Sequence, residues 1–354
     1  MFSTRSRARR VTGLTALAMA GTLTLTLTLS ACGGSTEAGG EGGGEAVTDA
    51  AITFIPKQLN NPYTDVVLGG GQEAAETAGF AEANVVGPLE ASASSQVTFI
   101  NAETQAGTDA IAIAANDPDA VCGALGEARS AGAKIVAFDS DTNPDCRDLF
   151  VNQVNSKDVA LIQLEMISEQ IGGEGKIAIL SATANATNQN EWIRFMEEEL
   201  ASNPEYENIE LVAKVYGDDD DNKSFQEAQG LLQAHPDLAG IVSPTTVGIA
   251  ATARYLSTSE HKGEVALTGL GLPNEMRSFV EDGTVTEFAL WDPAQLGEVT
   301  AHAAKALVDG TITGEAGETF TAGELGERTI EDGGIVVVGP PTEFNADNID
   351  DYDF

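Results

Sequence analysis

Asp139 and Asp141 are the side chains whose types and spacing most suit general acid–base chemistry, because a carboxyl group can hold or release a proton. No nucleophile with a matching base accompanies them, so hydrogen bonding to a ligand or turn formation suits the pair better. His235, His261 and His302 fall in helical or turn stretches, and their spacing predicts no metal-ligand set. We therefore expect no catalytic residue, no metal and no cofactor.

An acidic run at residues 218–221, followed by Asn222, has the composition of the start of a calcium-binding loop. It lacks the glycine at the sixth position and the final glutamate of such a loop. We therefore interpret the run as a solvated turn before a helix. The glycines at 69–71 lack the spacing, lysine and serine of a phosphate-binding loop, and we expect them to allow close helix–sheet packing.

Amide, carboxylate and hydroxyl side chains recur directly after the apolar runs of the sequence. Any single loop of this kind could cap the helix that follows it, since Asn, Asp and Thr accept hydrogen bonds from free helix N–H groups. Seven such loops at one sheet edge favour a binding site, and polar groups beside aromatic rings suit a sugar or polyol. The loops are residues 57–63, 116–119, 139–143, 181–190, 243–246, 269–271 and 291–292.

Alternating strand and helix patterns predict the elements that position these loops. In the first half we expect strands at 52–55, 84–87, 110–114 and 134–138, and helices at 64–78, 95–106 and 119–131. In the second half we expect strands at 176–180, 210–216, 240–242, 265–270 and 284–290, and helices at 191–200, 225–235, 247–256, 275–282 and 293–308. This alternation predicts an α/β fold with two doubly wound parallel sheets. In such folds ligands bind beyond the carboxyl ends of the strands.

The charge balance limits the possible partners. The chain has 18 Lys+Arg against 55 Asp+Glu, a formal net charge of −37. Such a field repels the phosphates of nucleic acids and anionic lipid headgroups, and it favours solubility. We therefore expect no nucleic acid partner. The length of 354 residues suggests two domains, each large enough to bury its own core.

The N-terminus has the pattern of a secretory leader: a basic start, a Thr-rich apolar run and then small residues. Leu29-Ser30-Ala31-Cys32 resembles the bacterial lipobox, in which the cysteine becomes the lipidated first residue. We expect residues 1–31 to be a lipoprotein signal peptide and residues 32–48 a Gly-rich tether from lipidated Cys32. An ordinary leader with an incidental cysteine is the alternative. Either way the protein is expected to be exported, with the lipid form held at the outer face of the cell membrane.

Cys122 and Cys146 are the remaining cysteines. In an exported protein an isolated pair is more often bridged than free, so we expect a disulfide, with two buried thiols as the alternative. A bridge closing a loop of this size would stabilise the fold by roughly 3 kcal/mol in the chain-entropy model. The spacing of cysteines and histidines predicts no zinc site.

Residues 50–354 resemble the type I periplasmic sugar-binding proteins of ABC importers. Residues 54–57 and 60–62 match the first ligand loop of that family. Similarity to its rhamnose-binding branch lies at 179–190, 215–219, 243–248 and 268–273. Similarity to its autoinducer-2-binding branch lies at 138–142, at the two cysteines and at 348–354.

In the autoinducer-2 branch the ligand is held by positions that match Lys57, Asp139, Gln189 and Pro244. Two further positions differ, because this chain has Asn188 where an aspartate is expected and Thr246 where an alanine is expected. The missing carboxylate would be a strong acceptor for ligand hydroxyls. The resemblance therefore implies a monosaccharide such as rhamnose, with autoinducer-2 as the alternative.

The resemblance also implies a Venus-flytrap architecture, in which two lobes joined by a three-strand hinge close on a sugar. The N-terminal lobe would comprise residues 49–154 with about 271–290, and the C-terminal lobe residues 155–270 with about 291–330. The tail, 331–354, would return across the hinge. Trp291 would be the stacking platform for the sugar. The implied ligand contacts are Lys57, Asn61, Tyr63, Asp139, Asn188, Gln189, Pro244, Thr245, Thr246, Trp291 and Asp292.

The implied function is that of a binding protein and not of an enzyme. It would deliver its sugar to an ABC import permease, act as a monomer, and contact the membrane only through its lipid anchor. A ligand-responsive repressor shares this fold, but it would need a DNA-binding head and a basic face. A signalling role, in which the ligand passes to a receptor instead of a permease, stays open.

Overall fold

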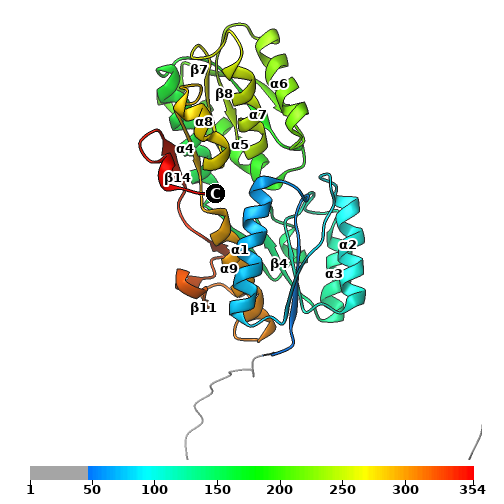
Figure 1. The fold of residues 1–354 in the computed structure, drawn as a ribbon. Coiled ribbons are helices and arrows are strands. Elements are labelled where there is room, and N and C mark those ends of the chain that lie inside the picture. The colour runs from blue at the N-terminus through cyan, green and yellow to red at the C-terminus, as the bar shows by residue number, and fades with distance from the viewer. Residues whose placement is uncertain (1–46) are drawn as a thin grey trace, which may run out of the picture. The chain divides into compact units, whose positions relative to one another are not determined.

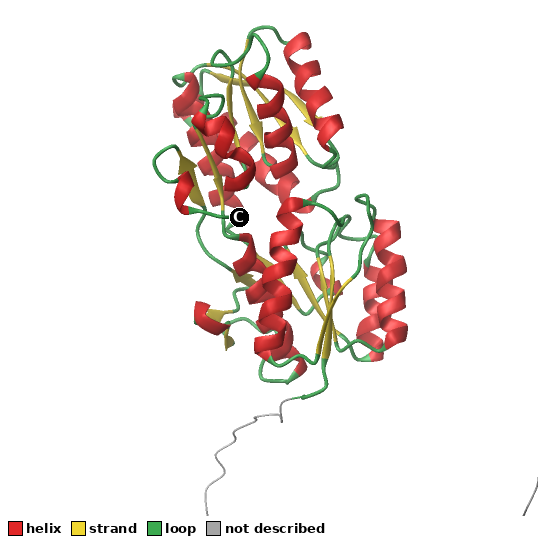
Figure 2. Ribbon diagram, viewed as in Figure 1, coloured by secondary structure: helices red, strands yellow, loops and turns green. Residues whose placement is uncertain are grey.

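The computed structural model describes residues 47–354 of the chain (Figures 1 and 2). The predicted signal peptide at 1–31, Cys32 and most of the predicted tether at 32–48 lie outside the described residues. Within 47–354, no helix combines the length and apolar character that a membrane crossing requires.

The first lobe is built on a parallel sheet with strand order β13-β5-β4-β3-β1-β2. Side chains alternate between its faces: Ile52 and Phe54 lie in one apolar cluster, whereas Ile55 lies in another. Helices α1 (Pro62–Ala78) and α9 (Pro293–Val308) cover the first face, and α2 (Ala93–Ala106) and α3 (Cys122–Ala131) cover the second (Figure 1). The strands are β1 (Ala51–Ile55), β2 (Glu82–Val85), β3 (Ala110–Ile113), β4 (Lys134–Phe138), β5 (Leu149–Asn152) and β13 (Ile335–Val337).

The second lobe is built on a parallel sheet with strand order β7-β6-β8-β9. A bridge between Leu270 and Ala289 continues it to β10 (Glu287–Leu290), which pairs antiparallel with β14 (Thr342–Asn345). Its other strands are β6 (Gly175–Ser181), β7 (Ile209–Tyr216), β8 (Leu238–Ser243) and β9 (Ala266–Gly269). Its helices are α4 (Ser156–Ile171), α5 (Thr187–Ser202), α6 (Asp221–Ala234), α7 (Thr246–Ser257) and α8 (Pro273–Glu281).

Smaller elements complete the described chain. A hairpin of β11 (Thr319–Thr321) and β12 (Glu327–Thr329) packs on α9 through β11. Four short 3-10 segments are η1 (Pro144–Cys146), η2 (Pro204–Tyr206), η3 (Gly323–Leu325) and η4 (Ile349–Asp351).

The last third of the chain is divided between the lobes in the reverse of the predicted way. Helix α8 and strand β10 join the core of the second lobe through Met276 and Phe288. Helix α9 joins the core of the first lobe through Leu296. Glycines make the α1–α9 contact possible, because a side chain at Gly70 would collide with the backbone of Ala294. Residues 271–290 therefore belong with the second lobe, and residues 293–308 with the first.

Gly70 and Gly71 serve close packing, as expected, but against a helix as well as the sheet, whereas Gly69 faces open space. A side chain at Gly71 would lie 2.8 Å from the ring of Phe54 on β1, and Gly297 of α9 meets the same turn of α1. The chain passes between the lobes at the β5–α4, β10–α9 and β13–β14 connections. These connections are where a hinge between the two cores would bend.

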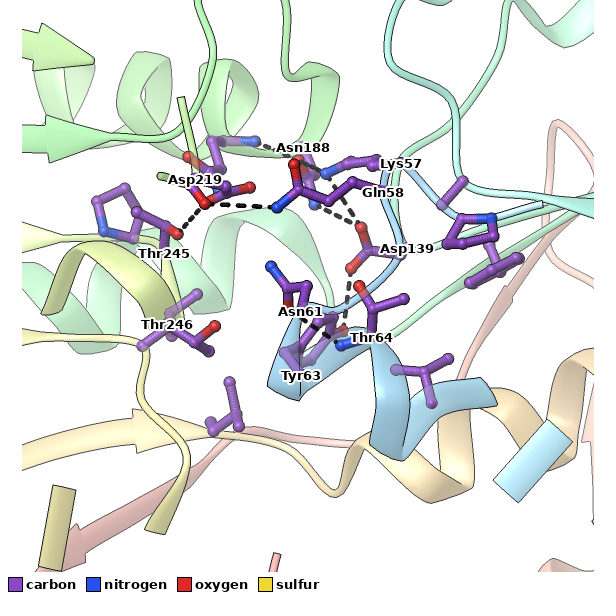
Figure 3. Close-up of a pocket in the computed structure, with 18 of the residues that line it drawn as sticks. Lys57, Gln58, Asn61, Tyr63, Thr64, Asp139, Asn188, Asp219, Thr245 and Thr246 are labelled. Atoms are coloured by element: carbon purple, nitrogen blue, oxygen red, sulfur yellow. Dashed lines mark hydrogen bonds and ion pairs between the residues drawn. The ribbon is translucent and has the colours of Figure 1, made fainter. Parts of the chain in front are cut away.

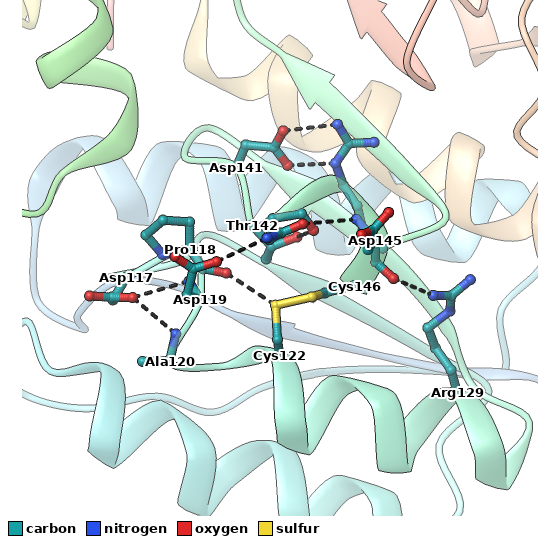
Figure 4. Close-up of a disulfide and its surroundings, with 12 residues drawn as sticks. Asp117, Pro118, Asp119, Ala120, Cys122, Arg129, Asp141, Thr142, Asp145 and Cys146 are labelled. Carbon is teal, nitrogen blue, oxygen red and sulfur yellow. Dashed lines mark hydrogen bonds and ion pairs between the residues drawn. A yellow bond between two sulfur atoms is a disulfide. The ribbon is translucent and has the colours of Figure 1, made fainter.

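The predicted disulfide between Cys122 and Cys146 is confirmed, with the two Cα atoms 5.3 Å apart (Figure 4). It joins the start of α3 to η1, immediately after the loop at residues 139–143. The same loop is held to the preceding one by the Asn143 side-chain amide, which donates to Asp119 Oδ1 at 3.0 Å. The bridge thus fixes two loops at the carboxyl edge of the first sheet.

Candidate ligand-binding site

A cavity lies where the strand ends of both sheets face each other (Figure 3). The space between its lining atoms is about 620 Å³, including the part open to solvent. Ten of the eleven predicted ligand residues line it: Lys57, Asn61, Tyr63, Asp139, Asn188, Gln189, Pro244, Thr245, Thr246 and Trp291. They come from loops far apart in sequence, as the rule for parallel sheets requires.

The loop after β1 presents Lys57 and Asn61 to the cavity. The Lys57 carbonyl accepts a hydrogen bond of 2.8 Å from the side-chain amide of Asn116, which holds the loop in place. Asn60 has φ 58°, a left-handed conformation that asparagine tolerates better than most residues. The side-chain oxygen Oδ1 of Asn61 caps α1, because it accepts a hydrogen bond of 3.2 Å from the backbone N–H of Thr64. The side-chain N–H₂ of Asn61 has no hydrogen-bond partner within the described part of the chain, and Asn61 lines the cavity.

Asp139 is the centre of the polar network at the cavity. Lys57 Nζ lies 3.1 Å from Asp139 Oδ2, and the Tyr63 hydroxyl donates to Asp139 Oδ1 at 3.0 Å. Burial, followed by the charge of Asp139, raises the pKa of Tyr63 well above its usual value, so the phenol stays a proton donor. Asp139 itself has φ 60°. A strained backbone at a cavity residue is typical of a functional position.

Asn188, near the start of α5, connects the second lobe to this network. Its Oδ1 accepts from Lys57 Nζ at 3.3 Å, and its Nδ2 donates to Asp139 Oδ2 at 3.4 Å. The neighbouring Gln189 uses its side-chain oxygen to accept from Ser181 Oγ at 2.6 Å and from the N–H of Ala182 at 2.7 Å. Gln189 is thereby held rigidly, and its N–H₂ group has no partner within residues 47–354.

Aromatic rings form the apolar wall of the cavity. Trp291 Nε1 donates to the Tyr63 hydroxyl at 3.0 Å, and the two rings meet edge to face at 6.1 Å. Trp192 packs edge to face against Trp291 at 6.0 Å and also lines the cavity. Flat rings beside a polar network match the two kinds of surface that a sugar carries.

Asp292 is the predicted ligand residue that does not line the cavity. Its carboxylate caps α9, accepting from the N–H of Ala294 at 2.9 Å. Asp141 also faces elsewhere, towards Arg147, whose Nε lies 2.6 Å from Asp141 Oδ1. Burial raises the pKa of Asp141 despite this ion pair. Both aspartates therefore have structural partners that account for their positions.

Further residues that were not predicted as ligand contacts also line the cavity, and they include Gln58, Trp192 and Asp219. Asp219 was interpreted as part of a solvated turn, but it lies at the carboxyl end of β7, and the strand-end rule places this position at the cavity. Trp192 lies one turn into α5. Its only sequence signal for a place at the cavity is that it follows the polar loop at residues 181–190. Within residues 47–354, no group of three or more His, Cys, Asp or Glu side chains is arranged to hold a metal ion.

The comparisons place the chain in a family. The sequence model of the family described as periplasmic binding protein domain matches residues 52–312. A sugar ABC transporter structure from Actinomyces odontolyticus is 74% identical, with a TM-score of 0.71, over 86% of this chain and 98% of that chain. An ABC transporter solute-binding protein from Clostridium phytofermentas with bound L-rhamnose is 37% identical, with a TM-score of 0.82, over 86% of this chain and 98% of that chain.

A third structure is LsrB from Clostridium saccharobutylicum in complex with AI-2. It is 26% identical, with a TM-score of 0.81, over 86% of this chain and 100% of that chain. The segment matched by the family model contains every cavity residue described above and all strands of the two parallel sheets except β13 and the first residue of β1. The protein therefore belongs to the periplasmic binding protein domain family, as the sequence resemblance implied.

Proposed function

We propose that the protein captures a monosaccharide resembling rhamnose between its two lobes and delivers it to an ABC import permease. The observation that carries this proposal is the cavity in which Lys57, Asp139 and Asn188 connect one lobe to the other beside two tryptophan rings. Such a cavity offers donors, acceptors and apolar faces together. A sugar presents hydroxyls and C–H faces in the same combination.

The same contacts explain how a ligand would select the closed form. Lys57 and Gln58 belong to the first lobe, and they donate to Asn188 Oδ1 and to the carbonyl of Asp219 in the second. A sugar that contacts both sides adds further bonds that exist only when the lobes are together. Its differential affinity for that arrangement shifts the population towards closure.

The similarity to the rhamnose-bound protein supports the choice of ligand, because 37% identity extends over nearly the whole of that chain. Autoinducer-2 is the second candidate, for uptake or for signalling. Lys57, Asp139, Gln189 and Pro244, which match its ligand positions, all line the cavity. Asn188 stands against it, because an amide replaces the expected carboxylate.

The proposed location is outside the cytoplasm, with the protein anchored through lipidated Cys32 and connected by the Gly-rich tether. This part of the proposal rests on the leader pattern of residues 1–31 and the lipobox. We propose a monomer that meets the membrane only through this anchor. Metabolic labelling with a fatty acid in a host that processes lipoproteins tests it, because Cys32→Ser should abolish incorporation.

The ligand is tested by thermal-shift screening of the chain without its leader against deoxy-sugars, pentoses and autoinducer-2. A specific ligand at 100 times its Kd should stabilise the folded state by about 2.7 kcal/mol. L-Rhamnose is expected to give the largest shift in the panel. The absence of a shift with every sugar would contradict the proposed function.

A further inference from the structure

Asp219 lies in the turn between β7 and α6, and this turn is firmly held. The N–H groups of Gly217 and Asp218 donate to the carbonyls of Ser181 and Ala182 at 2.8 and 3.0 Å. Asp218 and Asp219 have φ values of 56° and 52°, so the chain adopts two consecutive left-handed residues here. This conformation turns Asp219 into the cavity, while Asp218 pairs with Lys223 outside it.

The Asp219 carboxylate has acceptor positions to spare. Within residues 47–354, one side chain donates to it, the Thr245 hydroxyl (Figure 3). An ionised carboxylate can accept about four hydrogen bonds. Asp219 lines the cavity, so the remaining acceptor positions of its carboxylate can take hydrogen bonds from the hydroxyls of a bound ligand.

We propose that Asp219 is the second lobe's acceptor for ligand hydroxyls, supplying the carboxylate that is missing at Asn188. The inference rests on the proposed function and extends it to a specificity residue. Asn188 contributes an amide that is already used by Lys57 and Asp139. Asp219 approaches from a different strand end, so its preferred sugar hydroxyls differ from those that a carboxylate at position 188 would reach.

The charges at the cavity also define the ligand class. Asp139 is paired with Lys57 Nζ at 3.1 Å, whereas Asp219 forms no ion pair with any described lysine or arginine. The lining therefore carries two carboxylates against one lysine. An acidic sugar such as a uronate would meet an uncompensated like charge, so the site selects neutral sugars that donate hydrogen bonds.

Asp219→Asn tests this inference, and Asp218→Asn is its matched control. Asparagine has the same shape as aspartate and tolerates the left-handed backbone at both positions. Calorimetric titration with the sugar identified in the screen should show affinity about 10- to 100-fold weaker in Asp219→Asn, the usual effect of losing a charged acceptor. Asp218→Asn should bind within about twofold of the unmodified protein, because its side chain faces away from the cavity.

The outcomes separate this inference from the proposed function. A protein that binds no sugar contradicts the proposed function. A protein that binds a neutral sugar, with Asp219→Asn binding it equally well, contradicts only the role of Asp219. Asp219→Ser replaces Asp219→Asn if the latter does not fold. The affinity for a uronate is a second readout. A uronate should bind the unmodified protein at least tenfold more weakly than the neutral sugar, and this difference in affinity should disappear in Asp219→Asn.

Discussion

The two lobes each bring a carboxylate to the same cavity, and the two carboxylates have different surroundings. In the first lobe, Asp139 is paired with Lys57 and accepts a hydrogen bond from Tyr63. In the second lobe, Asp219 accepts from Thr245, and no described lysine or arginine pairs with it. Burial raises the pKa of Asp219, whereas the charge of Lys57 opposes that rise.

This difference shows that the two lobes of one binding site can contribute carboxylates in different states of pairing. The first lobe has its charge neutralised before a ligand arrives, and the disulfide holds the loop that follows β4. In the second lobe, Asp219 keeps acceptor positions that no side chain within residues 47–354 fills, and we propose that a ligand supplies the missing donors. The carboxylate of the first lobe therefore has its partners within the protein, whereas the carboxylate of the second lobe keeps acceptor positions for a ligand.

The largest effect is expected from Asp139→Asn, which removes the charge on the first lobe's side. Lys57 then loses its ion-pair partner, and the bonds that the side chain at position 139 makes to Tyr63 and a sugar weaken together. Calorimetry should show sugar affinity at least about 100-fold weaker, with an unchanged far-UV spectrum. The exposed Asp145→Asn is the control. Retention of full affinity in Asp139→Asn would remove Asp139 from the site.

Removal of the disulfide tests whether the first lobe owes its rigidity to that bridge. Replacing both Cys122 and Cys146 by serine opens a loop with a sequence separation of 24. We expect the free energy of unfolding to fall by roughly 3 kcal/mol, measured by urea denaturation. If the unfolding curve of the double variant superimposed on that of the parent, the bridge would contribute nothing to the lobe's stability.

Asp292→Ala distinguishes a cap from a ligand residue. Because its carboxylate caps α9, its loss should lower the free energy of unfolding by about 1 kcal/mol. Sugar affinity should stay within about threefold of the parent, since Asp292 does not line the cavity. A large loss of affinity without a loss of stability would restore Asp292 to the ligand set.

The smallest expected effect concerns the pH dependence of stability without ligand. The groups that act on Asp219 are the Thr245 hydroxyl, Lys57, Asp139 and Asp218. A folded-state pKa raised above the unfolded value means that stability from this group is present at acid pH and lost as pH rises through the folded pKa. Asp219→Asn removes this loss at neutral pH.

Melting temperatures without sugar should therefore be higher in Asp219→Asn than in the parent at pH 7, by about 1–3 °C. The difference should shrink as pH is lowered towards the ordinary range of aspartate. Asp218→Asn should show a smaller difference of the same sign, because the charge of Asp218 is the weakest of the effects that act on the pKa of Asp219. A lower melting temperature in Asp219→Asn at pH 7 would mean that the carboxylate stabilises the fold instead of being kept for a ligand.

Strand-end positions were the part of the site that could be predicted from the sequence, because parallel sheets bring those loops to one edge. That rule placed Lys57, Asp139 and Thr246 at the cavity. It applied equally to Asp219, but the acidic run around it favoured a solvated turn. The left-handed backbone that turns Asp219 inward has no local sequence signal beyond the tolerance of aspartate for it.

The division of the lobes could not be predicted in the same way. Strand β10 and helix α9 follow one another in sequence, yet their apolar faces pack into different cores. That choice depends on the fit between Gly70, Gly71 and Gly297, which involves residues more than 200 positions apart. Strand β5 and helix α4 were also missed, because a short buried strand and a helix with a mixed surface have weak periodic signals.

The central claim, that a sugar binds between the lobes, can be tested through the chain's own fluorescence. The chain contains 2 tryptophans, and both Trp192 and Trp291 line the cavity. Titration with the sugar found by screening should change the tryptophan emission saturably, with the same Kd as calorimetry and a one-to-one ratio. Calorimetric binding of a sugar with no change in emission from either tryptophan would contradict the account, because the ligand would then lie elsewhere.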